Sequence, residues 1–326
     1  MKKRLFCIVF CVLTTTMIFA AEKPSKINKE LMKDKVNINT VKKLIASGED
    51  VNQKYWGHYP FERINNNLEL VKIFIEADAL GREKYFAKAI REQYDDEIIQ
   101  YFCEHDLADP NKYVLRFQTY FEDKDKSIEE ICEKLKKITV GKLSNPLILY
   151  LVTSDKYDIV SELLNLDFNY KDEMGNSLIH LAAKNIDKNS LEVIKYAIKK
   201  GTSINSLNNS NQTALFFAST YYGPSINWSD PINENEEVAK INFIGGMPYF
   251  MNAREIQKAQ VEVVLFLLKN KINVNQVDIF GWTVLHYASA FYPEGLIELL
   301  ISNGADKDIK TKFGRTYLDI FNQREK

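Results

Sequence analysis

The side chains that most often carry out catalysis are few in this chain and far apart. Cys103 and His105 lie two positions apart, so on a helix they point in different directions and cannot act as a nucleophile and its base. A zinc site needs about four clustered ligands, which scattered histidines and two cysteines do not supply. We therefore predict neither a metal nor another cofactor. The four histidines are His58, His105, His180 and His286.

Acidic and glycine-rich stretches add no catalytic chemistry. The carboxylates at 123, 125, 129 and 130 are typical of a solvated loop followed by the start of a helix. Gly245-Gly246 lacks the flanking residues that a phosphate-binding loop needs. The sequence thus predicts a protein that is not an enzyme.

Residues 1–21 have the pattern of a secretory signal peptide. Three basic residues at 2–4 precede an apolar run at 5–12, and Ala20-Ala21 offers small residues for cleavage. The alternatives are a membrane anchor, for which the run is short, and a lipoprotein signal ending at Cys11, for which Phe10 is too bulky. We expect an exported protein, periplasmic or secreted, that carries a bacterial-type signal.

The charge balance argues against two kinds of partner. The formal net charge is −1, and loss of the three basic leader residues makes it −4. Without a strongly basic surface, nucleic acid and anionic membranes are not expected partners, and membrane insertion is not expected once the leader is removed.

Cys103 and Cys132 remain after the leader is removed. Export would permit a disulfide between them. The alternative is two buried thiols in neighbouring helices, since free cysteine packs as a small apolar side chain.

A short pattern recurs four times in the second half of the chain. Its copies begin at Gly175, Asn211, Gly281 and Gly314, so the first and last spacings are similar and the middle one is twice as long. Each copy has Ser or Thr two positions later and an apolar residue two positions after that. Glycine gives the turn backbone freedom and Ser or Thr can cap the helix that follows. A period of about 33 residues indicates a helical repeat array.

This pattern resembles the ankyrin repeat family, most closely from Asp278 to Lys310. The resemblance implies an all-α solenoid of stacked helix-turn-helix units and a scaffold for protein–protein interaction. It also implies that His180 and His286 bond turn backbone. The residues in register with the family unit are Asp278, Gly281, Thr283, Leu285, His286, Ala288, Leu299, Leu300, Gly304, Ala305 and Asp306.

The resemblance divides the chain into unequal parts. Residues 22–142 show paired helices with only partial matches, and we interpret them as degenerate repeats. Residues 143–326 contain the clear repeats, one long insertion at about 220–258 and a half-repeat that caps the C-terminal end. The insertion is rich in aromatic residues, which argues against disorder.

Ankyrin arrays bind partners through turn tips and the end of the first helix, on the concave side. In the last two units these positions hold apolar side chains, and clustered exposed aromatics are typical of a binding site. The alternative is that the insertion at 221–250 folds back over them and makes them core. The candidate partner-binding residues are Ile279, Phe280, Trp282, Phe291, Phe313 and Arg315, with a weaker echo at Tyr55 and Trp56.

We therefore predict an exported, monomeric, non-catalytic scaffold that binds another protein. The alternatives are a secreted effector or surface factor that engages a host protein, and an inhibitor or chaperone of an exported enzyme. The partner's identity does not follow from the fold, because specificity lies in variable surface residues.

Overall fold

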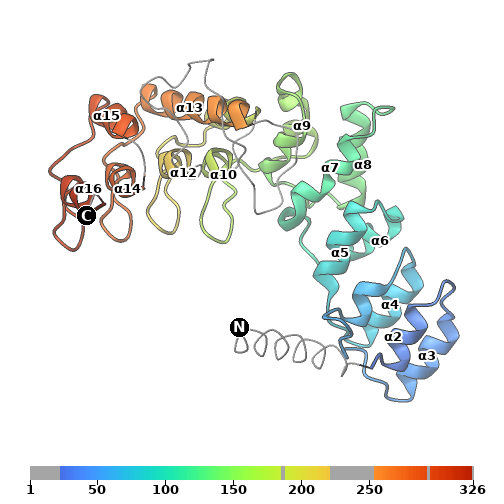
Figure 1. Cartoon of the computed structure of the whole chain (residues 1–326). Helices are drawn as coiled ribbons and strands as arrows, with labels where there is room; N and C mark the ends of the chain where they lie inside the picture. Colours follow the sequence, from blue (N-terminus) through green and yellow to red (C-terminus); the bar gives the residue numbers. More distant parts are fainter. Residues whose placement is uncertain (1–22, 185–187, 221–252, 292–293, 325–326) are drawn as a thin grey trace, which may run out of the picture. The chain divides into compact units, whose positions relative to one another are not determined.

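The computed structural model describes residues 23–184, 188–220, 253–291 and 294–324 (Figure 1). These residues form helices and two isolated bridges but no sheet, which confirms the predicted all-α solenoid class. None of the described helices is long and apolar enough to cross a membrane. The predicted signal peptide and residues 221–252 of the insertion lie outside the described residues. The chain divides into unit 1, Met1–Leu143, and unit 2, Ser144–Lys326.

Unit 1 consists of four successive helix pairs. The first elements of the pairs pack on one another in order, from α2 to η1, α5 and η2, and among the second elements α4 packs on α6 and α6 on α8. The elements are α2 (Lys26–Leu31), α3 (Ile38–Ala46), η1 (Pro60–Arg63), α4 (Leu68–Glu76), α5 (Arg82–Arg91), α6 (Asp96–Glu104), η2 (Pro110–Phe117), α7 (Gln118–Phe121) and α8 (Ile128–Ile138).

Local sequence explains where these elements begin. Asn37 and Asn67 accept hydrogen bonds from amides in the first turns of α3 and α4, and Ser127 forms a capping box with Glu130. Two of the first elements are short 3₁₀ helices that start at Pro60 and Pro110, where the missing N–H costs nothing. Each pair then buries one apolar face against its neighbours.

Unit 2 repeats the same plan with more regular elements. The first helices pack in the order η3, α10, α12, α14 and α16. Figure 1 shows α10, α12, α14 and α16 in one row, with the loops that precede α12, α14 and α16 on one side. The elements are η3 (Pro146–Leu151), η4 (Ser154–Lys156), α9 (Tyr157–Leu163), α10 (Leu178–Lys184), α11 (Ser190–Lys199), α12 (Ala214–Thr220), α13 (Ala253–Lys269), α14 (Val284–Phe291), α15 (Glu294–Ser302) and α16 (Tyr317–Arg324).

The two cysteines of unit 1 are free thiols in the structure. Cys103 lies in α6 and Cys132 in α8, and both are fully buried. Burial raises the pKa of each thiol to about 12. The structure therefore contains the two buried thiols that the sequence left as an alternative, and the disulfide is not formed in it.

Candidate partner-binding surface

Four loops of unit 2 share one backbone turn. The turn residue of each lies in the left-handed region, with φ of 75° at Gly175, 62° at Asn211, 78° at Gly281 and 78° at Gly314. In each loop its amide donates to the carbonyl three residues earlier, at N–O distances of 2.8 to 2.9 Å. Asparagine tolerates this conformation better than other side chains, which explains how Asn211 replaces glycine.

A side chain at the start of the loop fixes each of the first three turns. In the third, Asp278 Oδ1 accepts the amides of Phe280 and Trp282 at 2.8 and 2.9 Å, and Asp278 Oδ2 accepts the Tyr287 hydroxyl at 2.6 Å. Asp172 and Asn208 accept the equivalent amide pairs in the loops before it. An acceptor at this position holds the loop in one conformation. We call the four loops, residues 171–177, 207–213, 277–283 and 310–316, the fingers.

Backbone hydrogen bonds join neighbouring fingertips. The amide of Asn209 donates to Met174 O at 3.0 Å, that of Ile279 to Ser210 O at 3.1 Å, and that of Lys312 to Phe280 O at 3.1 Å. We call residues 173–174, 209–210, 279–280 and 312–313 the tip row. A Cβ on Gly281 would lie 2.8 Å from Lys312 N, so glycine is needed there for the close approach.

Two buried histidines each connect one finger to the next by hydrogen bonds. In the first finger, the Ser177 amide and hydroxyl donate to His180 Nδ1, and His180 Nε2 donates to Gln212 O at 2.9 Å in the next finger. His286 likewise accepts from Thr283 and donates to Arg315 O. This confirms the structural role that the resemblance implied for both histidines.

Burial lowers the pKa of both imidazoles. A proton added at Nδ1 would break the bonds from Ser177 or Thr283, so the neutral ring is the form that holds the fingers together.

The second finger has no histidine at this position and so lacks these hydrogen bonds. Phe216 occupies the histidine position, and Thr213 Oγ1 is a buried hydroxyl with no hydrogen-bond partner in the structure. Burying a hydroxyl without a hydrogen-bond partner lowers the stability of the fold, and a histidine at position 216 would supply that partner.

The last two fingertips expose apolar side chains. The exposed fractions are 45% for Ile279, 56% for Phe280 and 80% for Phe313. We call these three residues the apolar edge. The hydrogen bond that joins these two tips lies between backbone atoms of Phe280 and Lys312, and the three apolar side chains stay exposed. The middle of the row, Asn209-Ser210, is polar.

The other predicted site residues lie in different surroundings. Trp282 is half-buried, because its ring packs on Tyr287 with centroids 5.0 Å apart, so it supports the finger as well as facing outward. Arg315 is exposed and donates to Gln323 Oε1 at 2.9 Å. Phe291 ends α14, and its side chain lies outside the described residues.

Tyr55 and Trp56 belong to unit 1. Their rings stack at 4.9 Å, and Trp56 is 62% exposed at a φ of 52°. This pair is an exposed aromatic feature separate from the tip row.

Sequence reasoning did not single out two exposed apolar side chains of unit 2, one in the tip row and one in the last helix. Met174, 61% exposed, occupies the first tip at the position that Phe280 has in the third. Leu318, 49% exposed, lies in the first turn of the last helix, outside the tip row. Alignment on the turn glycine gives the place of Met174 in the row, whereas the exposure of Leu318 depends on α16 having no further helix packed over it in the described part of unit 2.

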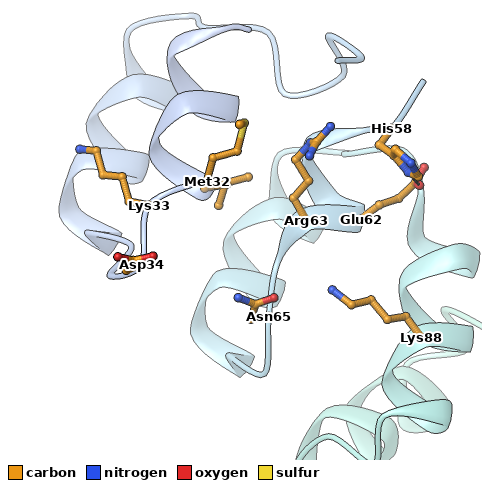
Figure 2. Close-up of a pocket in the computed structure, with 9 residues that line it drawn as sticks. Met32, Lys33, Asp34, His58, Glu62, Arg63, Asn65 and Lys88 are labelled. Atoms are coloured by element: carbon orange, nitrogen blue, oxygen red, sulfur yellow. Dashed lines mark hydrogen bonds and ion pairs between the residues drawn. The ribbon is translucent and has the colours of Figure 1, made fainter. Parts of the chain in front are cut away.

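One hollow of about 690 Å³ lies in unit 1 between α2, η1 and α5. Figure 2 shows Lys33, Glu62, Arg63 and Lys88 around it. Glu62 pairs with His58, and Lys33 pairs with Glu30. The charges are mixed and largely satisfied, so we assign this hollow no ligand. The described residues contain no cluster of three metal-binding side chains.

Comparison with known proteins agrees with the geometry of unit 2. Residues 146–226 match a family model described as ankyrin repeats in three copies, and residues 251–301 match one described as ankyrin repeats in many copies. An ankyrin repeat protein of Monkeypox virus is 36% identical over 89 residues, which are 27% of this chain and 14% of that protein. The chain therefore matches only a small part of this relative's length.

The fold is an all-α solenoid with ankyrin repeats over residues 146–226 and 251–301, and repeats of this kind indicate a protein-interaction scaffold. Protein partners are thus the class that the repeats imply.

Proposed function

We propose that this chain is a non-catalytic scaffold that binds a protein partner at the apolar edge of its tip row. The observation that carries the proposal is the exposure of Ile279, Phe280 and Phe313 on fingers whose geometry is fixed by other groups. Exposed aromatic side chains on a rigid backbone lose little conformational entropy on binding, and such residues dominate interface energies.

The size of the edge suits an anchor of this kind. Burying one exposed Phe side chain stabilises a complex by about 1.5 to 3 kcal/mol, so two such residues can supply much of a micromolar affinity. The polar tip at Asn209 and Ser210 would place hydrogen-bonding groups on one side of the anchor.

Site-specific cross-linking tests this proposal. A photo-reactive phenylalanine analogue at position 313 should capture a protein in cells that produce the chain. The same analogue at exposed position 307, outside the tip row, is the matched control. An adduct at 313 and not at 307 would support the proposal, while equal labelling at both positions, or at neither, would count against it.

We further propose that residues 1–21 are a signal peptide and that the scaffold acts in the periplasm or outside the cell. The basic start, the apolar run and Ala20-Ala21 support this. The intact mass of the purified protein reports cleavage, and an uncleaved chain in the cytoplasm would refute export. Protein in the culture supernatant would favour an effector or surface factor that engages a host protein. Retention in the periplasm would favour an envelope scaffold, or an inhibitor or chaperone of an exported enzyme.

A further inference from the structure

Basic side chains surround the apolar edge. Lys310, Lys312 and Arg315 are all exposed and belong to the finger that carries Phe313. Arg315 donates to the neutral amide of Gln323, so this contact leaves its charge uncompensated. Among the described residues, none of the three cations forms an ion pair.

Two of the nearby carboxylates, those of Asp278 and Asp319, accept hydrogen bonds from neutral groups. Asp278 is 4% exposed, and its two oxygens accept two amides and one hydroxyl within its own repeat. Asp319 Oδ2 accepts the Thr316 amide and hydroxyl at 2.8 Å. These bonds, together with the charges of Lys310 and Arg315, lower the pKa of Asp319. Residues 310–316 therefore present three exposed cations and no carboxylate, while the exposed Asp306 and Asp308 precede this stretch and Asp319 follows it.

The opposite end of the tip row differs in charge. Its first tip is Glu173-Met174 and its second is Asn209-Ser210. The first finger carries one exposed cation, Lys171 at the position equivalent to Lys310, whereas the last finger carries three and also holds Phe313. A ligand that crosses the row would meet the larger positive charge at the end that holds the aromatic side chains.

We propose that the tip row binds an acidic protein segment that carries a bulky apolar side chain. The apolar side chain lies against Phe280 and Phe313, and carboxylates on either side of it face Lys312, Lys310 and Arg315. The inference rests on the proposed function and names the chemistry of its partner. Charge complementarity of this kind raises the association rate and selects against basic partners.

A random peptide selection tests the inference without knowledge of the natural partner. The full chain without its leader selects from a library of short displayed peptides, and a Phe280→Ser/Phe313→Ser variant removes peptides that bind elsewhere. We expect the remaining peptides to be enriched in Asp or Glu around Leu, Phe or Trp. Peptides that depend on the two phenylalanines yet are neutral or basic would overturn the inference and leave the proposed function standing.

One enriched peptide is then synthesised and its affinity measured by fluorescence anisotropy. Lys312→Glu should weaken binding at least about tenfold, whereas Lys307→Glu, the same charge change outside the row, should change it less than about twofold. Raising NaCl from about 50 to about 300 mM should weaken binding to the unmodified chain and have little effect on the Lys312→Glu variant. Equal effects of the two substitutions would overturn the inference. A selection that yields no peptide dependent on the two phenylalanines would overturn the proposed function with it.

Discussion

The two units pair their helices alike but join successive repeats differently. In unit 2 the same backbone bond links each fingertip to the next. In unit 1 the junctions depend on individual side chains: Asn52 Oδ1 accepts the Leu80 amide at 2.7 Å, and Asn66 Oδ1 accepts the Asp95 amide at 2.8 Å. The difference shows that the repeat pattern encodes turn geometry, whereas helix pairing needs only apolar residues at helical spacing.

One junction is common to both units. Asn205 Oδ1 accepts the Asn273 amide and Asn275 Oδ1 accepts the Asp306 amide, at 2.7 and 2.8 Å, as Asn52 does in unit 1. Unit 1 therefore has the same asparagine bond, from Asn52, after one of its repeats. Its described residues form no backbone hydrogen bonds like those that join neighbouring tips in unit 2. A surface built on rigid tips is therefore a property of unit 2.

The largest loss of stability is expected from a side chain added where two fingers meet. Gly281→Ala and Gly314→Ala both force alanine to a φ of 78°, at a cost of about 1 kcal/mol each. Only Gly281 has a neighbour in the way, Lys312 N at 2.8 Å from the added Cβ. We expect Gly281→Ala to lower the free energy of unfolding by about 3 kcal/mol and Gly314→Ala by about 1 kcal/mol. Equal losses in urea melts would show that tip contact adds nothing.

Two substitutions of threonine by valine, which has nearly the same shape, test the hydrogen bond between Thr283 and His286. Thr283→Val leaves His286 Nδ1 without its hydroxyl partner, and we expect a loss of about 1 to 2 kcal/mol. Thr213→Val removes a buried hydroxyl that has no partner, so stability should stay within about 0.5 kcal/mol or rise. The same urea melts measure both. A larger loss at Thr213 would contradict the account of the second finger.

Acid should weaken unit 2 before unit 1. Burial holds the pKa of His180 and His286 below the ordinary 6.5, so between these values the unfolded chain binds more protons. Stability is therefore lost as the pH falls below about 6.5, by at most about 1.4 kcal/mol per pH unit for each histidine.

Unit 1 is expected to respond at lower pH. Hydrogen bonds from Lys33 and Asn37 lower the pKa of Glu30 from 4.5, so its contribution is lost only as the pH falls below that value. Hydrogen exchange at pH 7 and pH 5.5, corrected for intrinsic rates, should show faster exchange in α10 and α14 while α5 and α6 stay protected. Earlier loss of protection in unit 1 would contradict this order.

The thiols of unit 1 report local opening of the helices and not global stability. Because Cys103 and Cys132 are buried and their pKa values lie near 12, we expect alkylation at pH 8 to be slower than in the unfolded chain by about 100-fold or more. Mass spectrometry of pulse-alkylated protein measures this and also detects a disulfide. Fast labelling of the folded protein would show that α6 and α8 open readily.

The sequence predicted the repeats because their turns demand particular residues. Gly281, Thr283 and His286 each serve a backbone bond that few other residues can make, so their spacing identifies the fold. The tip positions of Phe280 and Phe313 followed from the same register. The packing of side chains could not be predicted from the sequence. Trp282 is half-buried because its ring packs on that of Tyr287, five positions later. The unpartnered hydroxyl of Thr213 likewise follows from Phe216 only once its neighbours are placed.

The central claim is that the apolar edge serves a partner and not the fold, and the Phe280→Ser/Phe313→Ser variant tests it most directly. Its free energy of unfolding and its affinity for the partner cross-linked at position 313 are measured on the same preparation. The account predicts an unfolding free energy within about 1 kcal/mol of the unmodified chain and an affinity at least about tenfold lower. A loss of about 3 kcal/mol or more in stability would instead show that these side chains are core.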